Sequence, residues 1–477
     1  MGTEVTSSHF SHLDFQRFQQ RLRDETRQLA DWFESRRFSE SGPIGGYELE
    51  AWLMDSNARP APINDRFLDM CDDALVVPEL AKFNVEFNGH PQVLAGGALK
   101  VMEDEFAATW RRCDKVAGRL GAALLMIGTL PTTREEDLHL DNMSNMTRYR
   151  ALNEQVLRLR HGRPLLLDIR GKRRLRGTHR DVMLESTATS FQVHLQVEPR
   201  LAARLYNAAH IISAPIVAAC ANSPYLFGSD LWDETRVPLF EQAVALTSAA
   251  GSRCGTVSRV TFGSGYIEES MFECYQENLE CYPVLLPDCS DEDPATLPHL
   301  RLHNGTIWRW NRPLIGFDEQ RRPHLRIEHR VVPAGPSIID TFANAALFFG
   351  LVYMIGRSER AAESRIDFTT ARDNFYTAAR LGLRARIVWL DGKRVSIKTL
   401  LRDHLIPLAR EGLAQLGLDG AQADHYLQIV GRRVATNRNG AAWQRAYVAK
   451  HHADMQELTL AYLERQHSGA PVHEWPV

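Results

Sequence analysis

Apolar and polar side chains alternate in several short segments of the chain, which is the pattern of β-strands with one buried and one polar face. The clearest segments are residues 82–89, 189–198 and 325–332, and GYELEAWLMD at residues 46–55 belongs with them although it is less regular. In the third segment, Leu325, Ile327 and Val331 alternate with charged residues. These patterns predict strands of an antiparallel sheet with one polar face.

Elsewhere, apolar positions recur every three to four residues and predict helices. This period covers residues 13–37, 99–120, 141–161 and 199–224, and it dominates residues 338–465. Residues 122–130 indicate a buried strand, residues 171–177 (GKRRLRG) a basic hairpin tip, and residues 225–315 a loop-rich stretch. The combination predicts an α+β fold, in which one face of the sheet packs on helices and the other opens to a charged cleft.

The same patterns divide the chain into three regions. We expect a helical N-terminal extension at residues 1–40, a catalytic core built on the antiparallel sheet at residues 41–337, and a mostly helical region at residues 338–477 that packs on the core.

Composition narrows the class of protein. The 477 residues carry a net charge of −3, so we expect neither a nucleic-acid partner nor a membrane surface. No segment has the roughly 18 consecutive apolar residues of a membrane helix, and the first forty residues lack the apolar core of a secretory leader. The seven cysteines include no CxxC pair and indicate reduced thiols. These features favour a cytoplasmic globular protein.

Acidic and imidazole side chains lie on the polar faces of the four predicted strands. They are Glu48, Glu50, Glu86, His194 and Glu328. If the strands share one sheet, these groups converge, and converging carboxylates repel one another unless a cation lies between them. Oxygen ligands with one imidazole suit Mg²⁺ or Mn²⁺ better than zinc.

Each strand also has a plainer interpretation. A polar strand face is often only solvated, and His194 could be a hydrogen-bonded sheet histidine. Arg326 and Arg330, which flank Glu328, could pair with acidic residues on a neighbouring strand.

Six segments, in this order, resemble the glutamate–cysteine ligase type 2 family of the glutamine synthetase superfamily. They are GYELEAWLMD, FNVEFNG, SFQVHLQVE, ANSPYLFGSDLWDETR, LRIEHRVV and NFYTAARLGL, and NRNGAAWQR resembles the family's C-terminal helical region. The resemblance implies a glutamine synthetase-like fold, a curved antiparallel sheet whose concave acidic face binds two or three Mg²⁺ ions and ATP. It also implies transfer of the ATP γ-phosphate to a carboxylate, followed by attack of an amine on the acyl phosphate. In the name-giving members the acid is glutamate, through its γ-carboxylate, and the amine is cysteine, as in glutathione biosynthesis.

The resemblance also implies roles for individual residues. Glu48, Glu50, Glu86, His194 and Glu328 match the metal site, and the catalytic groups would be Glu328, Arg330, which would reach the phosphate in transfer, and Arg236, which would hold a substrate carboxylate or a phosphate. Arg148, Tyr149, Arg326 and Gln192 would contact the nucleotide or substrate. Gln192 stands where many relatives have a histidine, so it could offer a carbonyl oxygen or bind substrate. For Arg330, Arg236 and the Arg148–Tyr149 pair, a purely structural role is the alternative.

Two other functions remain open at this point. Clustered carboxylates with one histidine also serve two-metal hydrolases, and a non-catalytic relative could bind a nucleotide or an amino acid. For the ligase we expect ATP, an amino acid and an amine as the partners, and a homodimer by analogy with the family. The motifs do not specify the amine.

Overall fold

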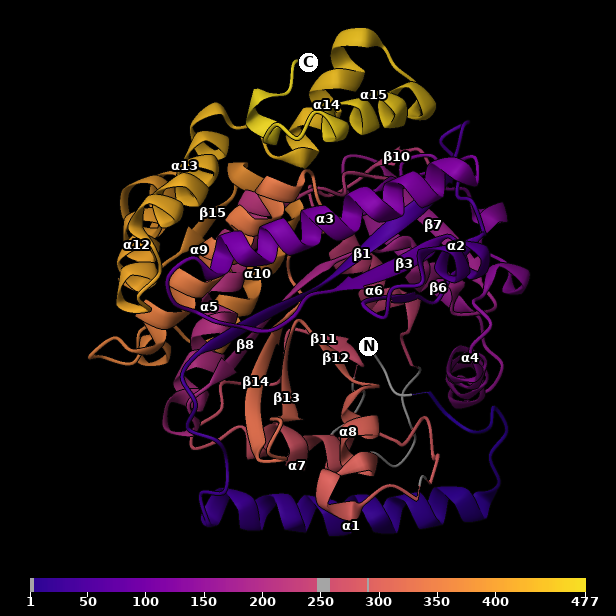
Figure 1. Cartoon of the computed structure of the whole chain (residues 1–477), viewed down its shortest axis with the longest axis vertical. Helices are drawn as coiled ribbons and strands as arrows, with labels where there is room; N and C mark the ends of the chain where they lie inside the picture. Colours follow the sequence, from indigo (N-terminus) through magenta and orange to yellow (C-terminus); the bar gives the residue numbers. More distant parts are fainter. Residues whose placement is uncertain (1–3, 247–257, 290) are drawn as a thin grey trace.

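The structure is a computed structural model that describes residues 4–246, 258–289 and 291–477. Its centre is a curled antiparallel sheet with the strand order β13–β14–β8–β1–β3–β2 (Figure 1). These strands are β1 (Ile44–Asp55), β2 (Val76–Pro78), β3 (Asn84–Asn88), β8 (Phe191–Val197), β13 (Asn311–Phe317) and β14 (Pro323–His329). The short strands β4 (Gln92–Val93) and β5 (Ala122–Leu125) also pair with β1. The predicted α+β fold with an antiparallel sheet is confirmed.

Helices cover the apolar face of the sheet. They are α3 (Ala98–Arg119), α5 (Ala202–Cys220) and α9 (Ile338–Gly356), which contact β5, β13 and β14, and β8, respectively. Side chains such as Leu49, Val85 and Ile327 point into this layer and are buried. Because successive residues of a strand face opposite sides, burying these positions turns their charged neighbours to the other face.

Helix α9 is long and apolar enough to cross a membrane by length and composition. Its apolar run is interrupted by Asp340, Thr341 and Asn344, so the prediction that no segment has about 18 consecutive apolar residues holds for it. Of its most apolar 18-residue window, 78% is nevertheless buried inside the structure, where α9 packs between α5, α12 (Ile406–Gln415) and α13 (Gly420–Thr436). These contacts are those of a core helix.

The remaining helices surround this centre. Helix α1 (His12–Glu34) begins with a capping box between Ser11 and Asp14, lies along one edge of the molecule and packs on α7 (Phe272–Cys281) and α8 (Pro298–Asn304) (Figure 1). The others are α2 (Asn64–Cys71), α4 (Thr147–Leu159), α6 (Arg236–Ala243), α10 (Phe368–Leu381), α11 (Ile397–Leu400), α14 (Gly440–His451) and α15 (Met455–His467).

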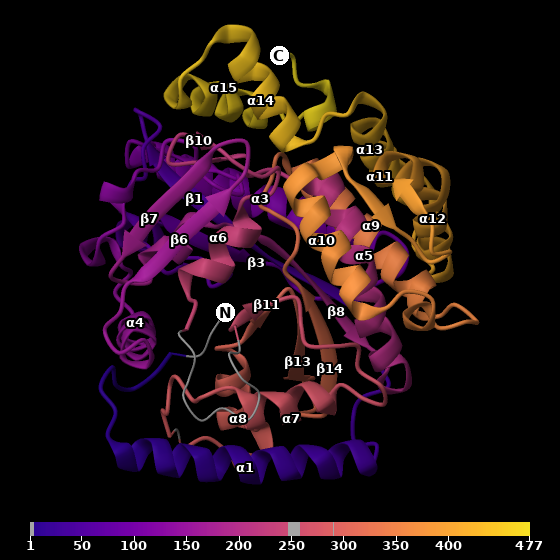
Figure 2. The ribbon, with the colours of Figure 1, turned by 180° about the vertical axis from the view of Figure 1, so that it is seen from behind.

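Within residues 4–246, 258–289 and 291–477, four small two-stranded sheets complete the architecture. The hairpin β6 (Leu165–Arg170) and β7 (Arg174–His179) confirms the predicted basic hairpin tip, and Figure 2 shows it beside α6 on the side opposite α3. The others are β9 (Tyr225–Leu226) with β10 (Ser229–Asp230), β11 (Val260–Thr261) with β12 (Trp308–Arg309), and β15 (Arg386–Val388) with β16 (Arg394–Ser396).

Three sequence expectations need correction. The helix expected at residues 141–161 begins only at Thr147, and the stretch 225–315 contains helices α6, α7 and α8. Five described cysteines are free thiols, but Cys281 is disulfide-bonded, so reduced thiols are not the rule throughout. Cys254 lies outside the described residues.

Candidate active site

Strand register brings the predicted acidic residues together. Strand β1 pairs with β3, and this register places Glu50 directly opposite Glu86. Strand β8 pairs with β14, and this register places His194 directly opposite Glu328. The backbone of Gly46 pairs with that of His194. All five predicted metal ligands therefore point to one face of one sheet.

The first group of ligands is the Glu48–His194–Glu328 cluster, whose candidate ligand atoms all lie within 4.8 Å of one another. His194 Nε2 is 3.5 Å from Glu48 Oε1 and 3.8 Å from Glu328 Oε1. This nitrogen is buried and has no hydrogen-bond partner among the described residues. Burial lowers the pKa of His194 to about 4, so the ring is neutral and has a lone pair available at neutral pH.

The second group is the Glu50–Glu79–Glu86 cluster, whose carboxylate oxygens also lie within 4.8 Å of one another. Burial, reinforced by the charges of Glu48 and Glu50, raises the pKa of Glu86 to about 7. Burial and the charges of Glu86 and Glu50 also raise the pKa of Glu79 well above its usual value. Three buried carboxyl groups at this distance favour protonation or a bound cation.

Both clusters fit divalent metal ions. Glu50 accepts hydrogen bonds from Ser190 and Gln192, and burial raises its pKa although the charges of Arg330 and Arg236 oppose this effect. The unpartnered Nε2 atom of His194 completes a set of carboxylate oxygens and one imidazole, a donor set that suits Mg²⁺ or Mn²⁺.

Arginines adjoin the first cluster. Arg312 on β13 holds Glu328 with two parallel hydrogen bonds, and Arg330 donates to Glu328 Oε2 at 3.1 Å and also to Gln192 Oε1. Burial raises the pKa of Glu328, but the charges of Arg312, Arg330 and His194 outweigh this effect and bring the pKa well below its usual value. Glu328 is therefore ionised at neutral pH.

Two arginines of the cavity have a side-chain N–H donor that no described residue accepts. The Nε atoms of Arg326 and Arg330 are buried and have no hydrogen-bond partner among the described residues. Both side chains line the same cavity as the two carboxylate clusters. They can bind anionic groups such as phosphate or carboxylate oxygens there.

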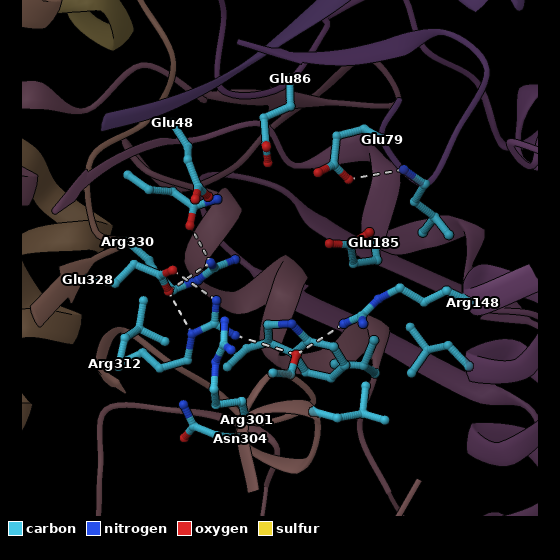
Figure 3. Close-up of a pocket in the computed structure, with 18 of the residues that line it drawn as sticks. Glu48, Glu79, Glu86, Arg148, Glu185, Arg301, Asn304, Arg312, Glu328 and Arg330 are labelled. Atoms are coloured by element: carbon cyan, nitrogen blue, oxygen red, sulfur yellow. Dashed lines mark hydrogen bonds and ion pairs between the residues drawn. The ribbon is translucent and has the colours of Figure 1, made fainter. Parts of the chain in front are cut away.

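The opposite wall of the cavity comes from α4 and from the 3₁₀ turn Met183–Thr187. Arg148 and Tyr149 lie on α4, and the backbone N–H of Val182, just before the turn, donates to Asn153 Oδ1 of α4 at 3.0 Å. In Figure 3 Glu185 lies between Glu79 and Arg148. Its carboxylate forms no hydrogen bond or ion pair with a described residue, and burial together with the charge of Glu50 raises its pKa to about 8.

Arg236 does not line this cavity, in contrast to the sequence expectation that it holds a substrate group. Its Nε atom donates to Glu234, and its two Nη atoms donate to the backbone carbonyl oxygens of Arg330 and Val331. The side chain is 2% exposed. It therefore lies behind Arg330 and supports the backbone that carries it.

Four charged residues that line the cavity were not predicted from the sequence: Glu79, Glu185, Arg301 and Arg312. Glu79 directly follows β2, a strand of three residues that is too short to show alternation. None of residues 171–177, the basic hairpin tip, lines the cavity.

Comparisons with known proteins bear on the family and the fold of the chain. The family model described as Glutamate-cysteine ligase family 2 matches residues 44–462. No curated protein sequence matches the chain.

Two solved structures are similar to this chain. Glutamate–cysteine ligase from Francisella tularensis, solved in complex with AMP, superposes with a TM-score of 0.54 over 92% of this chain and 91% of that protein, at 10% identity. A bifunctional glutathione synthetase from Pasteurella multocida gives a TM-score of 0.47 over 93% of this chain and 54% of that protein, also at 10% identity. At such identity the first of these similarities supports the fold.

Proposed function

The chain belongs to glutamate-cysteine ligase family 2, a family of ATP-dependent carboxylate–amine ligases, and we propose that it joins the γ-carboxylate of glutamate to cysteine or another amine. The reaction passes through an acyl phosphate. A single observation carries this proposal: two clusters of metal-ligating side chains and a group of arginines face one cavity.

We propose that Glu48, His194 and Glu328 hold one divalent cation and that Glu50, Glu79 and Glu86 hold another. Mg²⁺ or Mn²⁺ bound there would offset the negative charge of the triphosphate and of the substrate carboxylate. Gln192 donates to Glu50 and accepts from Arg330, so it links the second cluster to the arginine that faces it.

In the first step a carboxylate oxygen of the acid attacks the γ-phosphorus of ATP, and the bond to the β–γ bridging oxygen breaks. Arg330 and Arg326 stabilise the charge on the transferred phosphoryl oxygens, because their Nε donors are available and Arg330 is held in place by Glu328. The products of this step are ADP and an acyl phosphate.

In the second step the amine nitrogen attacks the acyl carbon and phosphate leaves, which gives an amide. We assign Glu185 to hold the amino group of the incoming substrate, because its carboxyl group lies on the cavity wall and forms no hydrogen bond or ion pair with a described residue. Its pKa of about 8 keeps much of it protonated at neutral pH, and the positive charge of an ammonium group would favour its carboxylate form. Arg148 and Tyr149 adjoin it on α4 and form the rest of this subsite.

The decisive test is an incubation with ATP, MgCl₂, glutamate and a panel of amines, followed by measurement of ADP and phosphate. Turnover that requires both the acid and the amine supports the ligase. Release of phosphate from phosphate esters without ATP would instead indicate a two-metal hydrolase. Nucleotide or amino-acid binding without turnover would indicate a non-catalytic relative.

We also propose that the chain acts in the cytoplasm as a homodimer and takes small-molecule substrates only. Light scattering of the purified protein at micromolar concentration tests the dimer, and a mass corresponding to one chain would reject it.

A further inference from the structure

Two free thiols meet on the helix-covered side of the sheet, away from the active site. Cys71 is the last residue of α2 and Cys113 lies in α3, and the two helices contact each other. The Sγ atoms are 3.5 Å apart. A disulfide has an S–S length of about 2.05 Å, so the sulfurs need to approach by only about 1.5 Å to bond.

The two thiols differ in access and in acidity. Cys71 is half-buried and reachable from solvent, whereas Cys113 is buried. The contact with Cys113 lowers the pKa of Cys71, and the same contact raises the pKa of Cys113. A reachable thiol that ionises readily, beside a second thiol that can displace a leaving group, is the arrangement of redox-active cysteine pairs.

We propose that Cys71 and Cys113 form a thiol–disulfide exchange site whose substrate is a low-molecular-weight disulfide. The Cys71 thiolate attacks one sulfur of the disulfide RSSR, forms the mixed disulfide Cys71–S–S–R and releases RS⁻. Cys113 then loses its proton to solvent, and its sulfur attacks Sγ of Cys71 and expels the second RS⁻. The protein dithiol is oxidised by two electrons, and RSSR is reduced to two thiols.

The resulting cross-link has a defined structural consequence. It closes the segment that runs from α2 through β2 and β3 to α3, and this segment carries Glu79 and Glu86 of the second cluster. Oxidation therefore restrains part of the active-site scaffold without touching a cavity residue. We expect slower amide hydrogen exchange in residues 72–88 and a higher Tm, both reversed by reductant.

The test treats the native protein with 2-hydroxyethyl disulfide and maps its cysteine peptides by mass spectrometry. Wild type should give a peptide pair linked through Cys71 and Cys113. Cys113→Ser should retain the hydroxyethylthio group on Cys71, because no second thiol displaces it. Cys71→Ser should leave Cys113 unmodified, since that side chain is buried. Cys289→Ser, a change at another free, half-buried thiol, is the matched control and should behave as wild type.

Circular dichroism of each variant verifies folding before the reaction. The proposal is overturned if wild type keeps the hydroxyethylthio group on Cys71 for as long as Cys113→Ser does, or if Cys71 stays unmodified while Cys289 reacts. Because the readout is peptide mass, it is independent of ligase activity.

Discussion

Arg312 and Glu328 face each other across β13 and β14 and are joined by two parallel hydrogen bonds, Nε to Oε2 at 2.7 Å and Nη2 to Oε1 at 2.9 Å. Glu328 is 1% exposed and is also directly opposite His194 on β8. This ion pair fixes the carboxylate of Glu328 at the junction between the arginines and the first carboxylate cluster. Glu328 therefore has two proposed roles: it is a ligand in the first cluster, and it holds the neighbouring arginines in place.

Glu328→Gln tests that double role. The variant removes one charge from the first cluster, so we expect turnover to fall by at least about 10²-fold. Steady-state release of ADP measures the loss, and circular dichroism verifies that the fold is kept. Glu319→Gln, at the exposed turn of the same hairpin, is the matched control and should keep full activity. Near-normal turnover of Glu328→Gln would reject the assignment.

Metal binding should strengthen as the pH rises from 6 to 8. Burial and then the charges of Glu48 and Glu50 raise the pKa of Glu86 to about 7, from an ordinary value of 4.5. In the metal-free protein this group keeps its proton in the folded state after the unfolded chain has lost it, so its contribution to stability decreases as the pH rises from about 4.5 to 7.

A divalent cation binds the carboxylate form and opposes that decrease. We therefore expect the apparent affinity for Mn²⁺ to increase by about tenfold between pH 6 and pH 8, and the rise in Tm on adding Mn²⁺ to be larger at pH 8. Calorimetric titration and thermal melts at the two pH values measure both. An affinity that stays constant or declines over this interval contradicts the second cluster as a metal site.

Glu185→Gln should affect the amine rather than the nucleotide. The neutral amide cannot attract a positively charged amino group, so the KM for the amine should rise by about tenfold or more while the KM for ATP changes little. Hydroxylamine is largely uncharged at neutral pH, so its conversion to a hydroxamate should be nearly unaffected. Glu269→Gln, at an exposed position, is the control. Equal losses with both amines would place Glu185 in phosphoryl transfer or metal binding instead.

Arg236→Gln should act on stability. It removes the cation beside the buried carboxylate of Glu234 and two donors to the backbone after β14. An unpaired buried charge typically costs roughly 3–5 kcal/mol, so the midpoint of urea unfolding should fall clearly. If the midpoint is unchanged and a substrate KM rises instead, Arg236 contacts substrate after all.

Strand alternation in the sequence was sufficient to place five acidic or imidazole side chains on one face, because the period of a strand determines which side chains share a face. It could not find Glu79, which follows Pro78 outside any alternating run. Arg312 was missed because Pro313 argues against a strand, but β13 is the edge of the sheet, where a proline is tolerated.

A motif match also says little about where a side chain points. Arg236 and Arg330 both belong to segments that resemble the family, yet only Arg330 reaches the cavity. The difference depends on the buried carboxylate of Glu234, which binds the Arg236 guanidinium on the far side of the Arg330 backbone. Such tertiary partners are not visible in local sequence patterns.

The most direct test of the ligase mechanism follows the oxygen atoms of the substrate. The acid that supports turnover is labelled with ¹⁸O in its reacting carboxylate, and the phosphate produced with ATP and the amine is analysed by mass spectrometry. Formation of an acyl phosphate predicts that each phosphate carries one oxygen from that carboxylate. Phosphate that contains oxygen only from ATP and water would contradict it.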